Sequence, residues 1–131
     1  MTAEKVKSDL RLIKYGRRDI DGMIAALEIK KKHLAFLKES KGSPAKIKSM
    51  QQYIQEKEKE IQVKICELDE LEKRYEQAIS CLDVIDRLII REGYLGTKSH
   101  VELAELLGYT VRGVEARISR VAEKLAESGL L

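Results

Sequence analysis

The sequence predicts an all-α protein, in which residues 1–80 form a long, coiled-coil-like antiparallel helical hairpin and residues 81–131 form a small helical domain. Three observations support this fold class. Charged residues make up 36% of the chain, with one Pro and no Trp, a composition typical of long helices. Apolar side chains recur at seven-residue spacing, and turn-forming residues gather at only a few places.

The first expected helix covers residues 3–40. Its seven-residue repeat places one side chain every two turns along a single stripe, which predicts a surface that packs against another helix. The repeat consists of Val6, Ile13, Ile20, Leu27 and Leu34. The segment 41–44 (KGSP) then ends this helix and begins the next, because Gly suits a helix end, Ser caps helices and Pro suits the first helical position.

The apolar repeat resumes at Ile47 and continues to Ile85, which predicts that both cysteines, Cys66 and Cys81, lie on one helix. Lys57 and Lys64 occupy repeat positions, so we expect the helix pair to be loosest around residues 57–64. The first 48 residues carry a net charge of +7, whereas residues 49–80 carry −3. Opposite charges favour pairing of the two helices, and the short link makes the pair antiparallel.

Composition also limits the classes of function. A net charge of +3 permits a nucleic-acid partner without requiring one. We expect a cytoplasmic protein with reduced thiols, because no signal region or apolar membrane span is present. No catalytic constellation, cofactor motif or metal-ligand spacing occurs, so an enzyme is the least supported class. Asp83 and Asp86 are interpreted as a solvated helix edge, and His100 as exposed.

A helix-turn-helix is predicted near the C-terminus. Ser99 and Glu102 have capping-box spacing and open a helix that we expect to bury Val101, Leu103, Ala104 and Leu107. Gly108 supplies the sharp turn and Thr110 caps the second helix, residues 111–127. The side chains expected to face inward from that helix are Val111, Val114, Ile118, Val121 and Leu125.

The outward face of the second helix combines small residues with arginines. A helix that enters the major groove of DNA needs small residues for close approach, and Arg or polar side chains for base edges and phosphates. The helix start can also bring free backbone amides to a phosphate. The candidate DNA-binding residues are Lys98, Ser99, Thr110, Arg112, Gly113, Glu115, Ala116, Arg117, Ser119 and Arg120.

The run HVELAELLGYTVRGVEARISRVAEKL resembles the promoter-reading C-terminal region of bacterial sigma factors. The match runs without gaps from the helix beginning Glu102-Leu103-Ala104-Glu105 to Lys124-Leu125. The whole layout, a charged hairpin followed by this domain, is similar to phage and prophage late-gene regulators of the ArpU and RinA type. The resemblance implies a sigma factor-like transcription regulator that binds double-stranded DNA, with RNA polymerase as a further partner. The chain lacks the sigma-factor segment that melts promoters.

Oligomerisation follows from the weak charge of the C-terminal domain. Residues 99–131 carry a net charge of −1, so a single domain neutralises few phosphates. We therefore expect a homodimer or higher homo-oligomer, formed through the hairpin, that sums the DNA contacts of several copies. The basic side chains of the first helix either contact DNA or form a solvated face. Two alternatives remain open, namely a phage small-terminase-like DNA-packaging protein and a structural coiled-coil interaction protein.

Overall fold

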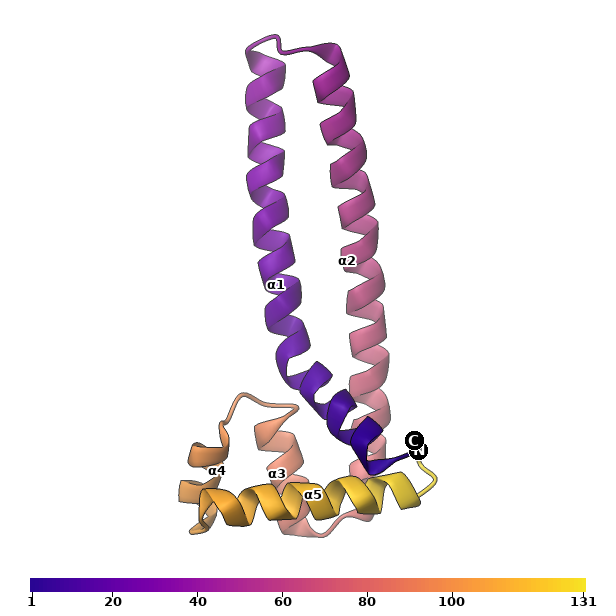
Figure 1. The fold of residues 1–131 in the computed structure, drawn as a ribbon, viewed down its shortest axis with the longest axis vertical. Helices are drawn as coiled ribbons and strands as arrows, with labels where there is room; N and C mark the ends of the chain where they lie inside the picture. The colour runs from indigo at the N-terminus through magenta and orange to yellow at the C-terminus, as the bar shows by residue number, and fades with distance from the viewer. The chain divides into compact units, whose positions relative to one another are not determined.

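The computed structural model describes all 131 residues and is all-α, without strands, which confirms the all-α class (Figure 1). Two long helices come first and three short helices follow. The elements are α1 (Ala3–Glu39), α2 (Pro44–Ala78), the 3-10 turn η1 (Ile79–Cys81), α3 (Val84–Gly93), α4 (His100–Leu107) and α5 (Val111–Glu127). Charged side chains recur throughout α1 and α2, and no helix is apolar enough over a sufficient length to span a membrane.

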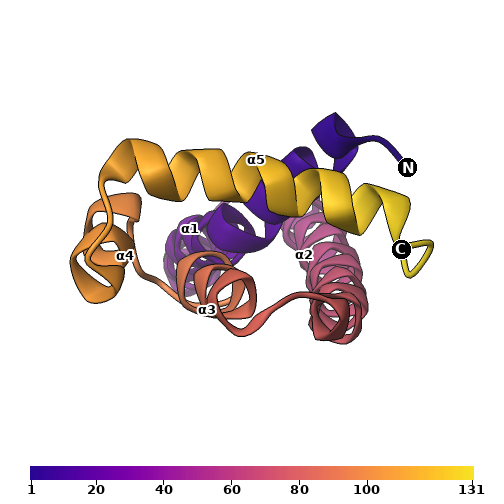
Figure 2. The ribbon, with the colours of Figure 1, turned by 90° about the horizontal axis from the view of Figure 1, so that it is seen from below.

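The chain divides into two compact units. One consists of residues 1–16 and 68–131, and the other of residues 17–67. This division differs from the expected boundary between residues 80 and 81, because the first unit includes the start of α1 and the end of α2. Val6, Leu10 and Tyr75 are fully buried there. Figure 2 shows the start of α1 beside α5.

In the unit formed by residues 17–67, segments of α1 and α2 run antiparallel and are joined by a short turn (Figure 1). The turn is a Schellman motif, in which the Gly42 amide donates to Leu37 O at 2.8 Å and the Lys41 amide donates to Lys38 O at 3.4 Å. The residue with left-handed backbone is Lys41, at φ 53°, and not the neighbouring glycine. The segment that ends the helix was therefore predicted, but the residue that bears the strained backbone was not.

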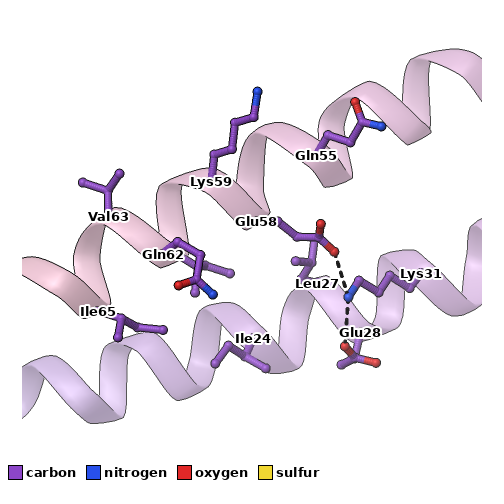
Figure 3. A pocket seen from close by; sticks show the side chains of 11 residues that line it. Ile24, Leu27, Glu28, Lys31, Gln55, Glu58, Lys59, Gln62, Val63 and Ile65 are labelled. Carbon is purple, nitrogen blue, oxygen red and sulfur yellow. Dashed lines mark hydrogen bonds and ion pairs between the residues drawn. The ribbon is translucent and has the colours of Figure 1, made fainter.

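An open groove of about 810 Å³ runs between the two helices of this unit (Figure 3). Leu27 and Ile61 are buried in its floor, and Lys31 crosses its end to reach Glu58 Oε1 at 2.9 Å. The hydrogen bond to Glu58 raises the pKa of Lys31. The groove is lined by residues 55–65 of α2.

The predicted continuous helix through both cysteines is wrong. Helix α2 ends at Ala78, Leu82 is extended (φ −87°, ψ 158°), and Asp83 caps a new helix by accepting a hydrogen bond from the Asp86 amide at 2.9 Å. The carboxylate of Asp83 satisfies an amide that has no partner within the helix, which favours a helix start at this position. Both cysteines are exposed and free, and they lie on separate elements.

Candidate nucleic-acid interface

The turn between α4 and α5 has the local geometry that its residues predict. Ser99 Oγ accepts from the Glu102 amide at 3.2 Å, while Glu102 Oε1 accepts from the Ser99 amide at 3.4 Å, completing the capping box. Gly108 ends α4 in the left-handed conformation at φ 69°, which a glycine adopts without strain. Thr110 Oγ1 then accepts from the Gly113 amide at 3.0 Å and begins α5.

A small apolar core holds α5 against α3 and α4. Its fully buried members come from all three helices. They are Ile89, Ile90, Leu103, Val114, Val121, Ala122 and Leu125. The expectation that Val101 and Val111 are buried is wrong, because both lie in the first turn of a helix and point away from this core, Val101 being 55% exposed. The core therefore fixes which face of α5 remains outward.

Most of the predicted site residues on α5 lie on that outward face. Thr110, Arg112, Glu115, Ala116 and Arg120 are exposed, and Gly113 and Ser119 are half-buried. Seven of the predicted residues are thus brought together between the N-cap Thr110 and Arg120. The Gly113 amide is bound by Thr110 Oγ1, whereas the amides of Val111 and Arg112 have no acceptor within the helix and are additional hydrogen-bond donors at the same end.

Arg117, the remaining predicted residue on α5, points inward instead. Its Nη1 lies 2.9 Å from Asp86 Oδ1 and 3.9 Å from Asp83 Oδ1, and its side chain is only 27% exposed. The guanidinium also lies over the ring of Tyr109, 5.6 Å from the centroid. Arg117 therefore joins α5 to α3 and to the turn that precedes α5, and its outward placement was a wrong expectation.

Asp86 was expected at a solvated helix edge, and this expectation is also wrong. The residue is 3% exposed, and its second oxygen accepts from Lys124 Nζ at 3.3 Å. The two cations explain why a carboxylate is tolerated in this core. The neighbouring Asp83 is exposed, and the hydrogen bond from the Asp86 amide, assisted by the charges of Lys124 and Arg117, lowers the pKa of its carboxyl.

The predicted site residues at the start of α4 form a hydrogen bond or an ion pair within the chain. The Ser99 hydroxyl serves in the capping box, and Lys98 Nζ lies 3.8 Å from Glu92 Oε2. His100, expected to be exposed, is half-buried. Its Nδ1 lies 3.7 Å from Glu115 Oε1 and its Nε2 lies 3.4 Å from the hydroxyl of Tyr94, whose pKa is raised by burial.

Sequence reasoning missed two buried polar clusters in this unit. One is the Asp86, Arg117 and Lys124 group, for which the only signal was the Asp-x-x-Asp spacing of a helix cap. The other joins α1 to α2, where the buried Tyr75 hydroxyl donates to the buried Asp9 Oδ2 at 2.8 Å. Burial and this hydrogen bond raise the pKa of Tyr75. Neither cluster touches the outward face of α5, so both act on the position of the helices.

The electrostatics of the outward face are mixed. Arg112 and Arg120 are exposed cations outside any ion pair, whereas Glu115 and Glu123 are exposed acids on the same helix. Such a face can donate hydrogen bonds to acceptors in a groove, and its modest charge confers little attraction for phosphates in general. Comparisons with models of protein families, with curated proteins and with solved structures found no match to this chain.

Proposed function

We propose that the protein is a sequence-specific transcription regulator that reads the major groove of double-stranded DNA with α5. The proposal extends to a regulator of the phage or prophage late-gene type, with RNA polymerase as a further partner, which is the role that the sigma-factor-like sequence implies. Residues 1–80 supply the oligomerisation element, and residues 81–131 supply the DNA-binding domain.

The observation that carries this proposal is the composition of the exposed face at the start of α5. Arg112 lies in its first turn, and Arg120 follows about two turns later. Between them Gly113 and Ala116 keep the surface low, so that the helix can approach base edges closely. Arg side chains form bidentate hydrogen bonds with guanine, and the free amides at the helix start suit a phosphate.

Arg117 has a different part in the proposed mechanism. Because its guanidinium is bonded to Asp86 on α3, it fixes the orientation of α5 relative to the remainder of the DNA-binding domain. The side chains that meet DNA are then presented from a fixed support, which reduces the entropy lost on binding. We assign base contact to Arg112, phosphate contact to Arg120 and positioning to Arg117.

Selection of bound sequences from random double-stranded DNA, followed by gel-shift titration, tests the proposal. We expect Arg112→Ala to weaken binding to the selected site by about 1–3 kcal/mol and to relax selectivity at one base pair. Arg120→Ala should weaken binding to all sequences alike. Arg91→Ala is the matched control, because Arg91 is an exposed arginine in the last turn of α3, away from the outward face of α5.

Three results would contradict this function. Absence of binding even at low salt would leave a structural or protein-binding role. Equal weakening by Arg112→Ala and Arg91→Ala would remove α5 as the reading helix. A large closed ring that binds DNA without sequence preference would favour the DNA-packaging alternative.

A further inference from the structure

The outer face of α1 carries a second apolar stripe that packs against nothing in the chain. Ile29 is 69% exposed and Phe36 is 64% exposed, and these are among the most exposed large apolar side chains. Ile29 lies two residues after the buried Leu27, so at about 100° per residue it points about 200° around the helix, away from α2. The stripe therefore cannot contribute to the pairing of α1 with α2.

Small residues on the same face lie N-terminal to these two side chains. Gly22 and Ala25 are both exposed, and a methyl group added at Gly22 would meet no atom within 4 Å. They form a shallow strip that a large side chain from another helix could enter. We call the face made by residues 18–36 on this side of α1 the outer α1 face. It lies wholly within the compact unit of residues 17–67.

We propose that the outer α1 face binds the same face of a second copy of the chain, with the two α1 helices antiparallel about a twofold axis. This proposal deepens the oligomerisation assigned under the proposed function, because it names the surface, the orientation and the register. The apolar contact places Ile29 of each copy against Gly22 and Ala25 of the other. Large side chains then meet small ones on both sides of the axis.

Charge complementarity selects this occupant and fixes the register. In an antiparallel pair about a twofold axis, side chains on the same edge of the two stripes face each other. Asp21 and Lys32 share one edge, at about 120° and 140° from Leu27 in the direction of increasing residue number, at 100° per residue. Pairing Asp21 with Lys32 of the second copy, and the reverse, forms two opposite-charge contacts in one register.

The same register places Arg18 of one copy across from Phe36 of the other, within one residue, at each end of the outer α1 face, an arrangement that suits a guanidinium over an aromatic ring. All of these side chains are exposed, and none forms an ion pair within its own chain.

The outer side of α2 offers no comparable surface. Its exposed residues there are mainly polar or charged, including Gln52, Gln55, Lys59 and Glu70, with Val63 as the isolated large apolar side chain. The observations therefore favour α1 against α1.

Sedimentation equilibrium of the full chain tests the proposal through charge exchange. Asp21→Lys and Lys32→Asp should each raise the dimer dissociation constant about tenfold, because each replaces two symmetric attractions by repulsions. The double variant Asp21→Lys with Lys32→Asp should return to within about threefold of the natural chain. Val63→Glu, which alters an exposed apolar residue of α2, is the matched control and should leave the dissociation constant unchanged.

Cross-linking tests the register independently. In a chain with Cys66→Ser and Cys81→Ser, Ala25→Cys lies on the outer α1 face near the proposed axis and should form a disulfide-linked dimer under mild oxidation. Ala35→Cys, exposed on a different face of α1, should remain a thiol. A natural chain that stays monomeric at all concentrations, a double charge variant that fails to recover, or equal cross-linking at both positions would overturn the proposal.

The same measurements separate this inference from the proposed function. A monomeric chain that still selects a DNA sequence through Arg112 would refute the α1 interface alone. A dimer with the expected charge rescue that binds no DNA would refute the DNA-reading role alone.

Discussion

At the scale of single residues, the role of a side chain on α5 depends on whether it faces solvent or the rest of the C-terminal domain. Arg112 and Arg117 are five residues apart and chemically identical, yet one is exposed and the other is bonded to the buried Asp86. The difference decides what a substitution reports. Replacing Arg112 alters a surface, whereas replacing Arg117 also leaves a buried carboxylate with fewer partners, a change that is costly in a protein interior.

Asp86→Ala should therefore lower the free energy of unfolding by about 3 kcal/mol, because two cations lose the carboxylate that holds them between α3 and α5. Urea denaturation followed by circular dichroism measures this change. The control is Glu105→Ala on the exposed side of α4, for which we expect a change within about 0.5 kcal/mol. Equal effects of the two substitutions would mean that the Asp86 cluster contributes nothing specific.

The buried Tyr75 makes the free energy of unfolding depend on pH in the alkaline range. Its pKa is raised in the folded state by burial and by the hydrogen bond to Asp9, while an unfolded tyrosine titrates near pH 10. The folded state thus holds the proton more tightly, so this contribution is complete below about pH 10 and is lost as the pH rises further. Tyr75→Phe lacks the titrating group.

Urea denaturation of the natural chain and of Tyr75→Phe at several pH values between about 8 and 11 tests the direction of this pH dependence. That range brackets the ordinary tyrosine pKa of about 10. Tyr75→Phe should be less stable at the lower pH values, because it loses the hydrogen bond, and its disadvantage should shrink as the pH rises. A constant difference across the whole range would show that Tyr75 does not titrate differently in the folded state.

At the scale of elements, α1 and α4 both end at a residue with left-handed backbone, but that residue is a glycine only in α4. Gly108 ends α4 in the left-handed region, where glycine is unstrained. Lys41 ends α1 in the same region, where a side chain is disfavoured by about 1–2 kcal/mol. The turn between the long helices therefore stores strain that the turn between α4 and α5 avoids.

Lys41→Gly should accordingly raise the free energy of unfolding by about 0.5–1 kcal/mol, since relief of strain exceeds the entropy that glycine adds to the unfolded chain. Thermal or urea unfolding measures the gain. Lys46→Gly, an exposed lysine within α2, is the matched control and should lower stability by about 1 kcal/mol. A loss of stability in both variants would contradict the assignment of strain to Lys41.

The sequence predicted helix caps well and long-range side-chain partners poorly. The capping box at Ser99 and the turn at Gly108 depend on residues within a few positions, so local spacing is sufficient. The break after Ala78 escaped prediction because apolar residues continue at three- and four-residue steps through Leu82 and Ile85. Whether Arg117 faces a groove or Asp86 depends on where α3 packs, which periodicity within α5 cannot determine.

At the scale of the whole molecule, the two compact units carry separable tasks under the proposed function. One holds the outward face of α5, and the other holds the outer α1 face. Because the two surfaces share no residue, DNA contact and self-association can be removed independently by substitution. The charge also differs between the parts of the chain, with +7 in residues 1–48 and −1 in residues 99–131.

The retention of Arg117 and Lys124 by Asp86 has a consequence for how such a regulator would search a genome. Two of the four cations in residues 99–131, Arg117 and Lys124, are paired with Asp86, so part of their charge is neutralised within the chain. Random DNA holds a protein through its phosphates, so each copy would dwell only briefly on sequences that α5 does not recognise. Long residence would then be confined to places where several copies find matching bases together, making occupancy depend steeply on protein concentration.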